Sequence, residues 1–444
     1  MASQKRSRLA VLTLAVLAAA PVGAQSPAPP PLRLSFAEAV RRAAGEAPAV
    51  ELSGLRTDEA EARVRQARGV LLPTLSITGG WLDRDFNSKT QGISFPGVPT
   101  IIGPFTAYDA RVRVTQTLLD FSALSRVRAA RTQVTGFGAE GSAVSEGAAA
   151  GAALAYLRVA RAAAQVAARQ ADSAIALELV GLAQAQKAAG VSAAIDVTRA
   201  RSQLAQAEGS VLVARNQLDR ARIDLARALG LGPEARLEIS DSLSATLPGA
   251  DLPAARDSIV VLALARRPDL RAELARGDAA RTARSAIAAE RLPRLDLAAD
   301  YGLSGLTPSL AVGTRQIGVQ VTIPILDGFR REGRAAEAAA LARESDVRAR
   351  DLRQQVAADV EGALLDLASS EAQQAIAAER LGLAADELAQ ARERFAAGVA
   401  GNIEVINAQS SLLRARDTDI DARFAAATAR VALARAAGVA RTLH

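Results

Sequence analysis

Cysteine is absent from this 444-residue chain, and histidine occurs once, at His444. Without cysteine the chain can form no disulfide, hold no metal through thiolates and carry no lipid on an N-terminal cysteine. A single histidine at the last position argues against a histidine-based catalytic or metal site. The sequence also contains no glycine-rich phosphate loop and no nucleophile–histidine–acid arrangement. It therefore predicts a protein that is not an enzyme and that needs no cofactor.

Aromatic residues are scarce as well, at 3% of a chain that is 50% hydrophobic. Alanine supplies much of the apolar fraction. A globular enzyme of this length would carry more large side chains to fill its core. Small apolar residues suit closely packed helices that share long, thin interfaces, so the composition favours a mainly α protein.

Residues 1–24 have the pattern of a secretory signal peptide. Lys5, Arg6 and Arg8 precede an apolar run over 9–20, and small residues close the segment. The run is well short of the ~20 residues that a membrane-spanning helix needs, and no later segment resembles such a helix. We expect an exported chain whose mature part keeps +4 of the formal +7 charge, because the segment holds three cations and no acid. Without a basic block, this surface predicts no nucleic acid partner.

The chain is similar to itself in four landmarks that recur in the same order, which indicates one internal duplication. Alanine-rich helices alone would not repeat an ordered set of landmarks. The landmarks are Ala47-Pro48 with Arg267-Pro268, Leu72-Pro73 with Leu292-Pro293, Leu119-Asp120 with Leu326-Asp327, and Gly190-Val191 with Gly398-Val399.

Four segments alternate apolar and polar residues with a period of two, which is typical of strands. The clearest is 317–325, where Ile317, Val319 and Val321 alternate with glycine, glutamine and threonine. Their length fits the ~9–11 residues of a tilted strand that crosses a bilayer. Trp81 and Tyr301 lie in these strands, as aromatic girdles of membrane barrels would require. A soluble sheet edge or small sandwich is the alternative that alternation alone leaves open.

Two proline-free stretches, 120–187 and 328–395, are rich in alanine and arginine and predict very long helices. At 1.5 Å per residue each helix would be ~100 Å long. After the first stretch, apolar residues recur at steps of seven, the period of a coiled-coil seam, so the chain returns alongside itself. These residues are Val197, Leu204, Val211, Leu218 and Leu225.

Each repeat is therefore expected to contain a helix, two strands and a long helical hairpin. A capping box at Ser35 and Glu38 begins the first helix, and the prolines at 73 and 293 end the first helix of each repeat. The first repeat, 25–229, has a helix over 35–72, strands over about 74–82 and 106–119, and a hairpin over 120–229. A connecting segment, 230–256, leads to the second repeat, 257–444, with a helix over 257–292, strands over about 294–303 and 315–326, and a hairpin over 328–440.

Four strands are too few to close a membrane barrel, since the smallest have about eight. An open sheet edge is forbidden in lipid because its backbone groups would lack partners. Subunits must then share one barrel, and a trimer would supply twelve strands with twelve long helices below them. The predicted fold is mainly α with membrane β: a trimeric 12-stranded β-barrel continuous with an α-helical coiled-coil tunnel.

These features resemble the TolC-like outer-membrane efflux proteins, or outer membrane factors. The resemblance covers essentially the whole mature chain and rests on the segment 32–40, the Leu-Pro breaks before the strands, Leu-Asp-Gly-Phe at 326–329 and both Gly-Val turns. It implies a homotrimer in the cell outer membrane, surrounded by lipid, with its tunnel in the periplasm. It also implies partners: a periplasmic adaptor (membrane fusion) protein and an inner-membrane pump, in tripartite efflux or type I secretion.

In that family the hairpin tips close the periplasmic mouth and dock the adaptor. The resemblance places the docking tips at Gly190, Val191, Gly398 and Val399. Glycine also fits these positions independently, because a helix that reverses in few residues commonly ends in a left-handed residue.

The same resemblance places a periplasmic gate just inside the tips. Its residues are Asp196, Glu404, Asn407 and Phe395. Three copies of each carboxylate around a narrow mouth would favour cations. The sequence alone favours a simpler role for both, as first-turn acids that stabilise a helix N-terminus. Asn407 occupies a position where some relatives have a second carboxylate, and Ala400 one where some have a basic residue. Phe395 occupies a position where some relatives have a hydrogen-bonding tyrosine, so packing would hold this mouth shut. Lys187 aligns with Phe395, which predicts two chemically different tips.

Two other classes of protein compete with the channel hypothesis. A periplasmic coiled-coil adaptor without a pore would have one hairpin flanked by small β domains. A coiled-coil scaffold or adhesin would not need the four strands. The sequence does not identify the exported substrate or the class of pump.

Overall fold

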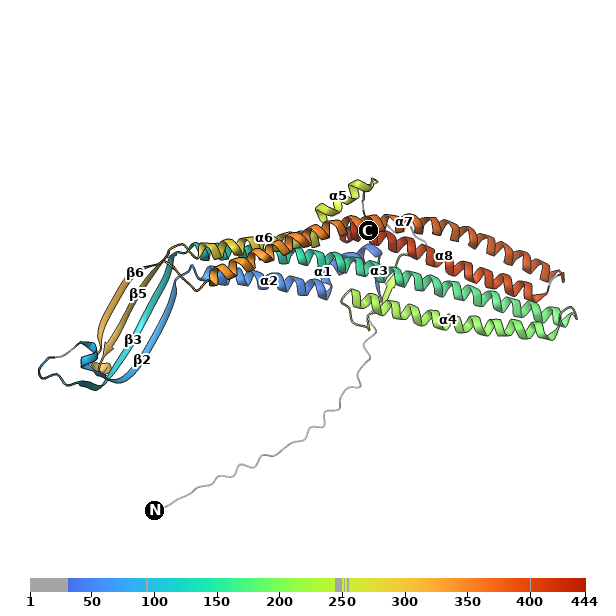
Figure 1. The fold of residues 1–444 in the computed structure, drawn as a ribbon. Helices are drawn as coiled ribbons and strands as arrows, with labels where there is room; N and C mark the ends of the chain where they lie inside the picture. The colour runs from blue at the N-terminus through green and yellow to red at the C-terminus, as the bar shows by residue number, and fades with distance from the viewer. Residues whose placement is uncertain (1–30, 93–94, 244–249, 251, 254, 400) are drawn as a thin grey trace, which may run out of the picture.

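The computed structural model describes residues 31–92, 95–243, 250, 252–253, 255–399 and 401–444. The predicted signal peptide, residues 1–24, lies outside the described residues, as does part of the connecting segment 230–256. The chain is elongated, with a sheet at one end and long helices that run from it to two hairpin tips at the other (Figure 1). Among the residues described, no helix is both long and apolar enough to cross a membrane.

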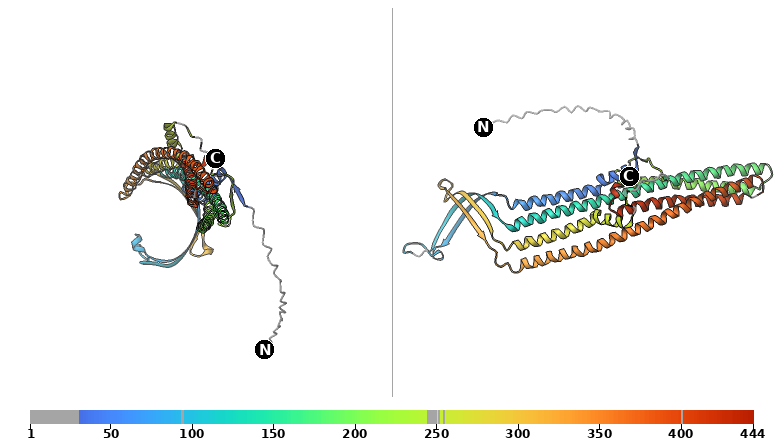
Figure 2. Two further views of the ribbon diagram at one scale, coloured as in Figure 1. Left: turned by 90° about the vertical axis from the view of Figure 1, so that its right-hand side faces the viewer. Right: turned by 90° about the horizontal axis from the view of Figure 1, so that it is seen from above.

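Two helices run along the whole helical part of the molecule. They are α3 (Phe121–Ala188) and α7 (Arg330–Ala396). Their 68 and 67 residues correspond to ~100 Å at 1.5 Å per residue. The helices α4 (Ala194–Ala228) and α8 (Asn402–Ala436) return beside them from the tips to the middle of the molecule (Figures 1 and 2). Val197, Val211 and Leu225 of the predicted seam are buried.

The helices that precede the sheet are broken where a single helix was expected. The expected helix over 35–72 is two helices, α1 (Phe36–Glu46) and α2 (Pro48–Gly69). The expected helix over 257–292 is likewise α5 (Arg256–Arg266) and α6 (Pro268–Ala289). A proline forces the residue before it out of the helical conformation, and Ala47 and Arg267 have ψ values of 141° and 118°. Each proline then begins the following helix, a position where its missing N–H costs nothing.

The four long strands form one antiparallel sheet in the order β2-β3-β5-β6. The strand bounds are Thr74–Asn87, Ile101–Leu119, Arg294–Gly305 and Val312–Thr322. All four extend farther toward the loops than predicted. The last ends at Thr322 and not at 326, because Pro324 has no N–H to donate to a neighbouring strand. Seen along the molecule, the sheet follows an arc (Figure 2), and its outer strands β2 and β6 each keep one unpaired edge.

The pairing divides the sheet into an apolar face and a polar face. Leu75, Val114, Ala299 and Ile317 are paired across all four strands and define the apolar face. The adjacent row of Ser76, Arg113, Asp300 and Gln316 lies on the polar face. Arg111 on that face donates to Asp300 at 2.8 Å, and Thr117 donates to Asp296 at 2.9 Å. Large apolar side chains on the other face are solvent-exposed in the single chain, for example Ile77 at 78%.

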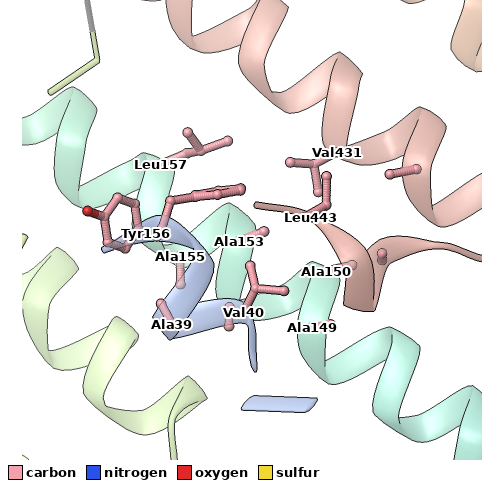
Figure 3. Close-up of a cluster of buried hydrophobic side chains, with 14 of the residues drawn as sticks. Ala39, Val40, Ala149, Ala150, Ala153, Ala155, Tyr156, Leu157, Val431 and Leu443 are labelled. Atoms are coloured by element: carbon pink, nitrogen blue, oxygen red, sulfur yellow. The ribbon is translucent and has the colours of Figure 1, made fainter. Parts of the chain in front are cut away.

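A buried core joins the two repeats at the middle of the molecule (Figure 3). Tyr156 and Leu157 of α3 contribute side chains that are fully buried, together with Val40, Val431 and Leu443 from other elements. Two short strands that the sequence did not predict, β1 (Leu32–Leu34) and β4 (Leu237–Ile239), pair in parallel beside it. The mainly helical class, the four strands and the duplication are confirmed.

Candidate functional site

The candidate site is the pair of helix turns at the end of the molecule farthest from the sheet (Figure 1). The first turn joins α3 to α4, and the second joins α7 to α8. We call them the first and second tips. Both are built on the residues that the sequence singled out.

Each tip begins with the same hydrogen-bonded helix end. In the first tip the N–H of Gly190 donates to the carbonyl of Lys187 and the N–H of Val191 to that of Gln186, both at 3.0 Å. Gly398 and Val399 repeat this pattern in the second tip. Such an end requires a left-handed residue, and the two glycines have φ values of 75° and 72°. A side chain at either position would strain the turn.

The residue after each glycine presents an apolar side chain to solvent. Val191 is 64% exposed and Val399 is 72% exposed. We call these two residues the tip valines. The two tips lie against each other, since a Cβ added to Gly398 would be 3.8 Å from Cγ1 of Val191. A small apolar patch therefore covers the end of the molecule farthest from the sheet, and a partner could bind it.

Asp196 begins α4 as a helix-capping residue. Its carboxylate accepts a 3.3 Å hydrogen bond from the N–H of Ala193, the residue three positions earlier. Arg199 lies 3.8 Å away, one turn along the helix. This geometry fits the simple role that the sequence favoured for Asp196, and it leaves the carboxylate partly exposed.

Glu404 occupies the same position in α8 but has a different partner. Its carboxylate lies 3.2 Å from the guanidinium of Arg394, across the second tip. Both side chains are about half exposed. Sequence reasoning missed Arg394, although its place near the end of α7 would bring it opposite the start of α8. Each predicted gate carboxylate thus has an arginine of its own.

The other two predicted gate residues lie in contrasting surroundings. Phe395 is 2% exposed and packs in a core formed by both hairpins, with Leu388, Val405 and Leu412. Asn407 is exposed, and its side chain has no hydrogen-bond partner among the described residues. Phe395 therefore holds the hairpins together inside one subunit.

Two hydrogen bonds from amide side chains to backbone carbonyls connect the hairpins near the tips, and the sequence predicted neither. The Gln186 side chain donates to the carbonyl of Phe395 at 2.7 Å, and the Asn402 side chain donates to the carbonyl of Asp196 at 3.0 Å. Asn402 is 2% exposed. Gln186 aligns with Arg394, so equivalent positions of the two repeats make different bonds, and the two tips are chemically different.

A buried group of charges connects the hairpins farther from the tips. Asp172 of α3 is 2% exposed and accepts from Arg416 of α8 at 2.5 Å and from Arg169 at 3.1 Å. Arg169 also donates to Asp417. Desolvation lowers the pKa of the Arg169 guanidinium, but the hydrogen bonds to Asp417 and Asp172 raise it by more, so this pKa lies above its ordinary value. These ion pairs around the buried Asp172 carboxylate connect the first hairpin to the second.

The described residues at the tips offer no arrangement for catalysis or metal binding. In the part of the chain that the structure describes, no three histidine, cysteine, aspartate or glutamate side chains are placed to hold a metal ion. The tips can contact a partner through apolar side chains and can form a charged rim.

The family model described as "Outer membrane efflux protein" matches residues 39–231 and 259–439 of this chain. The two matched segments correspond to the two repeats. Protein CyaE of Bordetella pertussis is 27% identical over 425 residues, which cover 93% of this chain and 86% of that protein.

Solved structures of outer-membrane channels have the same fold. The Campylobacter jejuni CmeC outer membrane channel is similar with a TM-score of 0.78 and 15% identity, over 91% of this chain and 86% of that one. CusC is similar with a TM-score of 0.77 and 19% identity, over 91% of this chain and 92% of that one. At these identities the likeness shows the fold alone.

Proposed function

The chain belongs to the outer membrane efflux protein family, and on that premise we propose that three copies assemble into one passive exit duct across the outer membrane. The protein is an outer-membrane efflux channel protein and not an enzyme. In the proposal a pump in the inner membrane supplies the energy, and a periplasmic adaptor links that pump to the tips. The assembly serves tripartite efflux or type I secretion.

The observation that carries this proposal is the four-stranded sheet with one apolar and one polar face and two unpaired edges. An apolar face of this kind is stable against lipid, but unpaired edges are not. Pairing β6 of one subunit with β2 of the next removes every edge, and three subunits would then give twelve strands. The polar face, with Arg111, Asp300 and Thr117, would line the lumen.

The helices support a tunnel continuous with that barrel. Because α3 and α7 are the next elements after β3 and β6, each subunit would extend the wall of the barrel by ~100 Å into the periplasm. The exposed tip valines would then lie at the periplasmic end, where an adaptor docks. Gly190 and Gly398 would shape this docking surface by allowing the tight turns.

The gate in this proposal is a rim of paired charges. Asp196 and Glu404 would each occur three times around the mouth, with Arg199 and Arg394 beside them. Since each acid has a basic neighbour, the rim would favour cations less strongly than bare carboxylates would. Phe395 would hold the hairpins in place by packing, and Asn407 would lie exposed on the same helix as Glu404.

Planar-bilayer recording of the purified protein, with its mass measured in detergent, tests the proposal. We expect a trimer that inserts and conducts without an energy source. Recovery of the protein in the soluble periplasmic fraction, or a trimer that does not conduct, would contradict it.

A further inference from the structure

One cation, Arg315, lies among apolar residues on the apolar face of the sheet. Arg315 of β6 pairs with Tyr301 of β5. Tyr301 in turn pairs with Val112 of β3, and Val112 pairs with Ile77 of β2. Residues paired in this way point to the same side of a sheet. The rows on either side of this one contain only apolar residues and glycine on all four strands. They are Leu75, Val114, Ala299 and Ile317 on one side, and Gly79, Ala110, Leu303 and Gly313 on the other.

Arg315 has no partner within the described part of the chain. Its side chain is exposed and makes no ion pair or hydrogen bond there. Arg111 on the polar face, by contrast, lies 2.8 Å from both Asp109 and Asp300. In a shared barrel β2 of the next subunit would flank β6. The apolar-face residues of β2 from Leu75 to Trp81 include no carboxylate, and the first acid on that face is Asp83, at the end of β2 near the loops. Within a single subunit, Arg315 therefore has no ion-pair partner among the described residues.

The position of Arg315 along β6 is close to the loops. It is three residues from the start of the strand at Val312 and seven from its end at Thr322. These separations correspond to ~10 Å and ~23 Å along the strand. An arginine at this height can extend its charged group to the headgroup level while its stem stays in the apolar layer. Near the interface such a charge is tolerated far better than at the midplane.

Tyr301 places a second polar group at the same height. Its hydroxyl would lie 3.0 Å from a Cβ added to Gly313, so the ring crosses from β5 onto β6, toward the loops. Gly313 makes room for that ring. The guanidinium of Arg315 and the hydroxyl of Tyr301 can then both donate to one anion above the apolar layer.

We infer that Arg315 and Tyr301 bind the phosphate of a lipid headgroup in the outer leaflet. The inference rests on the proposed function, because it requires this face to lie in the membrane. A guanidinium binds phosphate through two parallel hydrogen bonds, and a tyrosine at the interface has an apolar ring with a polar tip. Three equivalent sites would surround the barrel.

Native mass spectrometry of the detergent-purified trimer with bisphosphorylated lipid A as the probe tests this site. We expect binding to weaken at least tenfold in Arg315→Gln and a few-fold in Tyr301→Phe, and to survive partly in Arg315→Lys. The matched control is Arg113→Gln, which removes another exposed arginine from the polar face of the same sheet and should leave lipid binding unchanged.

Three results would overturn the inference. One is an Arg315→Gln trimer that binds lipid A as the wild type does. Another is equal loss in Arg113→Gln, which would indicate a nonspecific charge effect. The third is complete displacement of lipid A by millimolar inorganic phosphate, which would indicate a free-anion site. Bilayer conductance of Arg315→Gln distinguishes failure of the lipid-binding inference from failure of the proposed channel function. A variant that conducts supports the channel proposal, whether or not it binds lipid A.

Discussion

Asn402 at the start of α8 donates a 3.0 Å hydrogen bond to the backbone carbonyl of Asp196 at the start of α4. The two residues are 206 positions apart in the sequence, and the bond joins the two hairpins within one subunit. The Asn402 side chain is buried, yet the Oδ1 oxygen of its amide has no hydrogen-bond partner among the described residues. The bond thus positions the tips while leaving one buried acceptor unsatisfied.

Substitution of Asn402 by alanine should therefore affect gating more than stability. The lost hydrogen bond costs about 1 kcal/mol, but the unsatisfied oxygen is removed as well, so the two effects partly cancel. We expect a change in the free energy of unfolding of under about 1 kcal/mol and a higher open probability in planar bilayers. Gln373→Ala, on an exposed part of α7, is the control. An Asn402→Ala channel with the same open probability as the wild type would remove this bond from the gate.

The ion pair between Arg394 and Glu404 should tune ion preference at the mouth. Glu404→Ala leaves Arg394 without its partner, so cation preference should fall. An exposed pair is worth about 0.5–1 kcal/mol, which corresponds to roughly a two- to fivefold change in the permeability ratio. Reversal potentials in a salt gradient measure this ratio.

The double variant Arg394→Ala/Glu404→Ala is the matched control for that change. Because it removes both charges, its permeability ratio should return toward that of the wild type. Unchanged reversal potentials in Glu404→Ala, or equal shifts in the single and double variants, would exclude the pair from the conduction path.

The tip valines should be needed for adaptor binding but not for conduction. Val191→Asp with Val399→Asp places charges on the exposed apolar patch, and burying them in an interface is costly. We expect the affinity for a cognate periplasmic adaptor protein to fall about tenfold or more, measured by surface plasmon resonance. Conductance of the isolated trimer should persist. Full affinity in the double aspartate variant would place the docking surface elsewhere.

High pH should weaken the middle of the molecule through Tyr156. Its hydroxyl donates to Asp241 at 2.9 Å, its side chain is fully buried, and burial raises its pKa from 10.0 to about 12. Since the folded pKa is above the unfolded one, the neutral phenol contributes stability that is complete below pH 10 and is lost between pH 10 and pH 12. The loss should be on the order of 2 kcal/mol.

Urea unfolding of the wild type and of Tyr156→Phe at pH 9, 10, 11 and 12 measures this effect. The phenylalanine variant cannot ionise, so its stability should decline less over the same range. The lysines at 5, 89 and 187 are the only ones in the chain, so few other groups titrate there. Parallel curves for the two proteins would contradict the assignment to Tyr156.

The parts of the fold that depend on local pattern were predictable from the sequence. Heptad spacing and the absence of proline predicted the long helices, and period-two alternation predicted the strands. The breaks before Pro48 and Pro268 were missed because helical composition continues on both sides of each proline. In the sequence, those prolines indicated only the internal duplication, and no helix break was predicted there.

The parts that depend on contacts between distant segments were not predictable. The strand Leu32–Leu34 has three residues, and its partner begins at Leu237, so no periodicity indicates either. The bonds of Gln186 and Asn402 require the two hairpins to be in one particular register. Asp196 and Glu404 align in the two repeats, yet one caps its helix and the other pairs with Arg394, because residue 394 is arginine and its counterpart is Gln186.

Subunits that share a barrel should become linked when cysteines are placed on the two edge strands. The chain has no cysteine of its own, so Ile77→Cys on β2 can be combined in turn with Ile317→Cys, Val319→Cys or Val321→Cys on β6. A disulfide needs Cα atoms within about 7 Å, and one of the three pairs should meet this condition across the subunit boundary. Mild oxidation should then give covalent dimers and trimers on a non-reducing gel. Ile77→Cys with Val112→Cys, which are register partners within one chain, should give only an oxidised monomer. If that control forms its disulfide while all three β2–β6 pairs stay monomeric, the edges do not meet and the barrel is not shared.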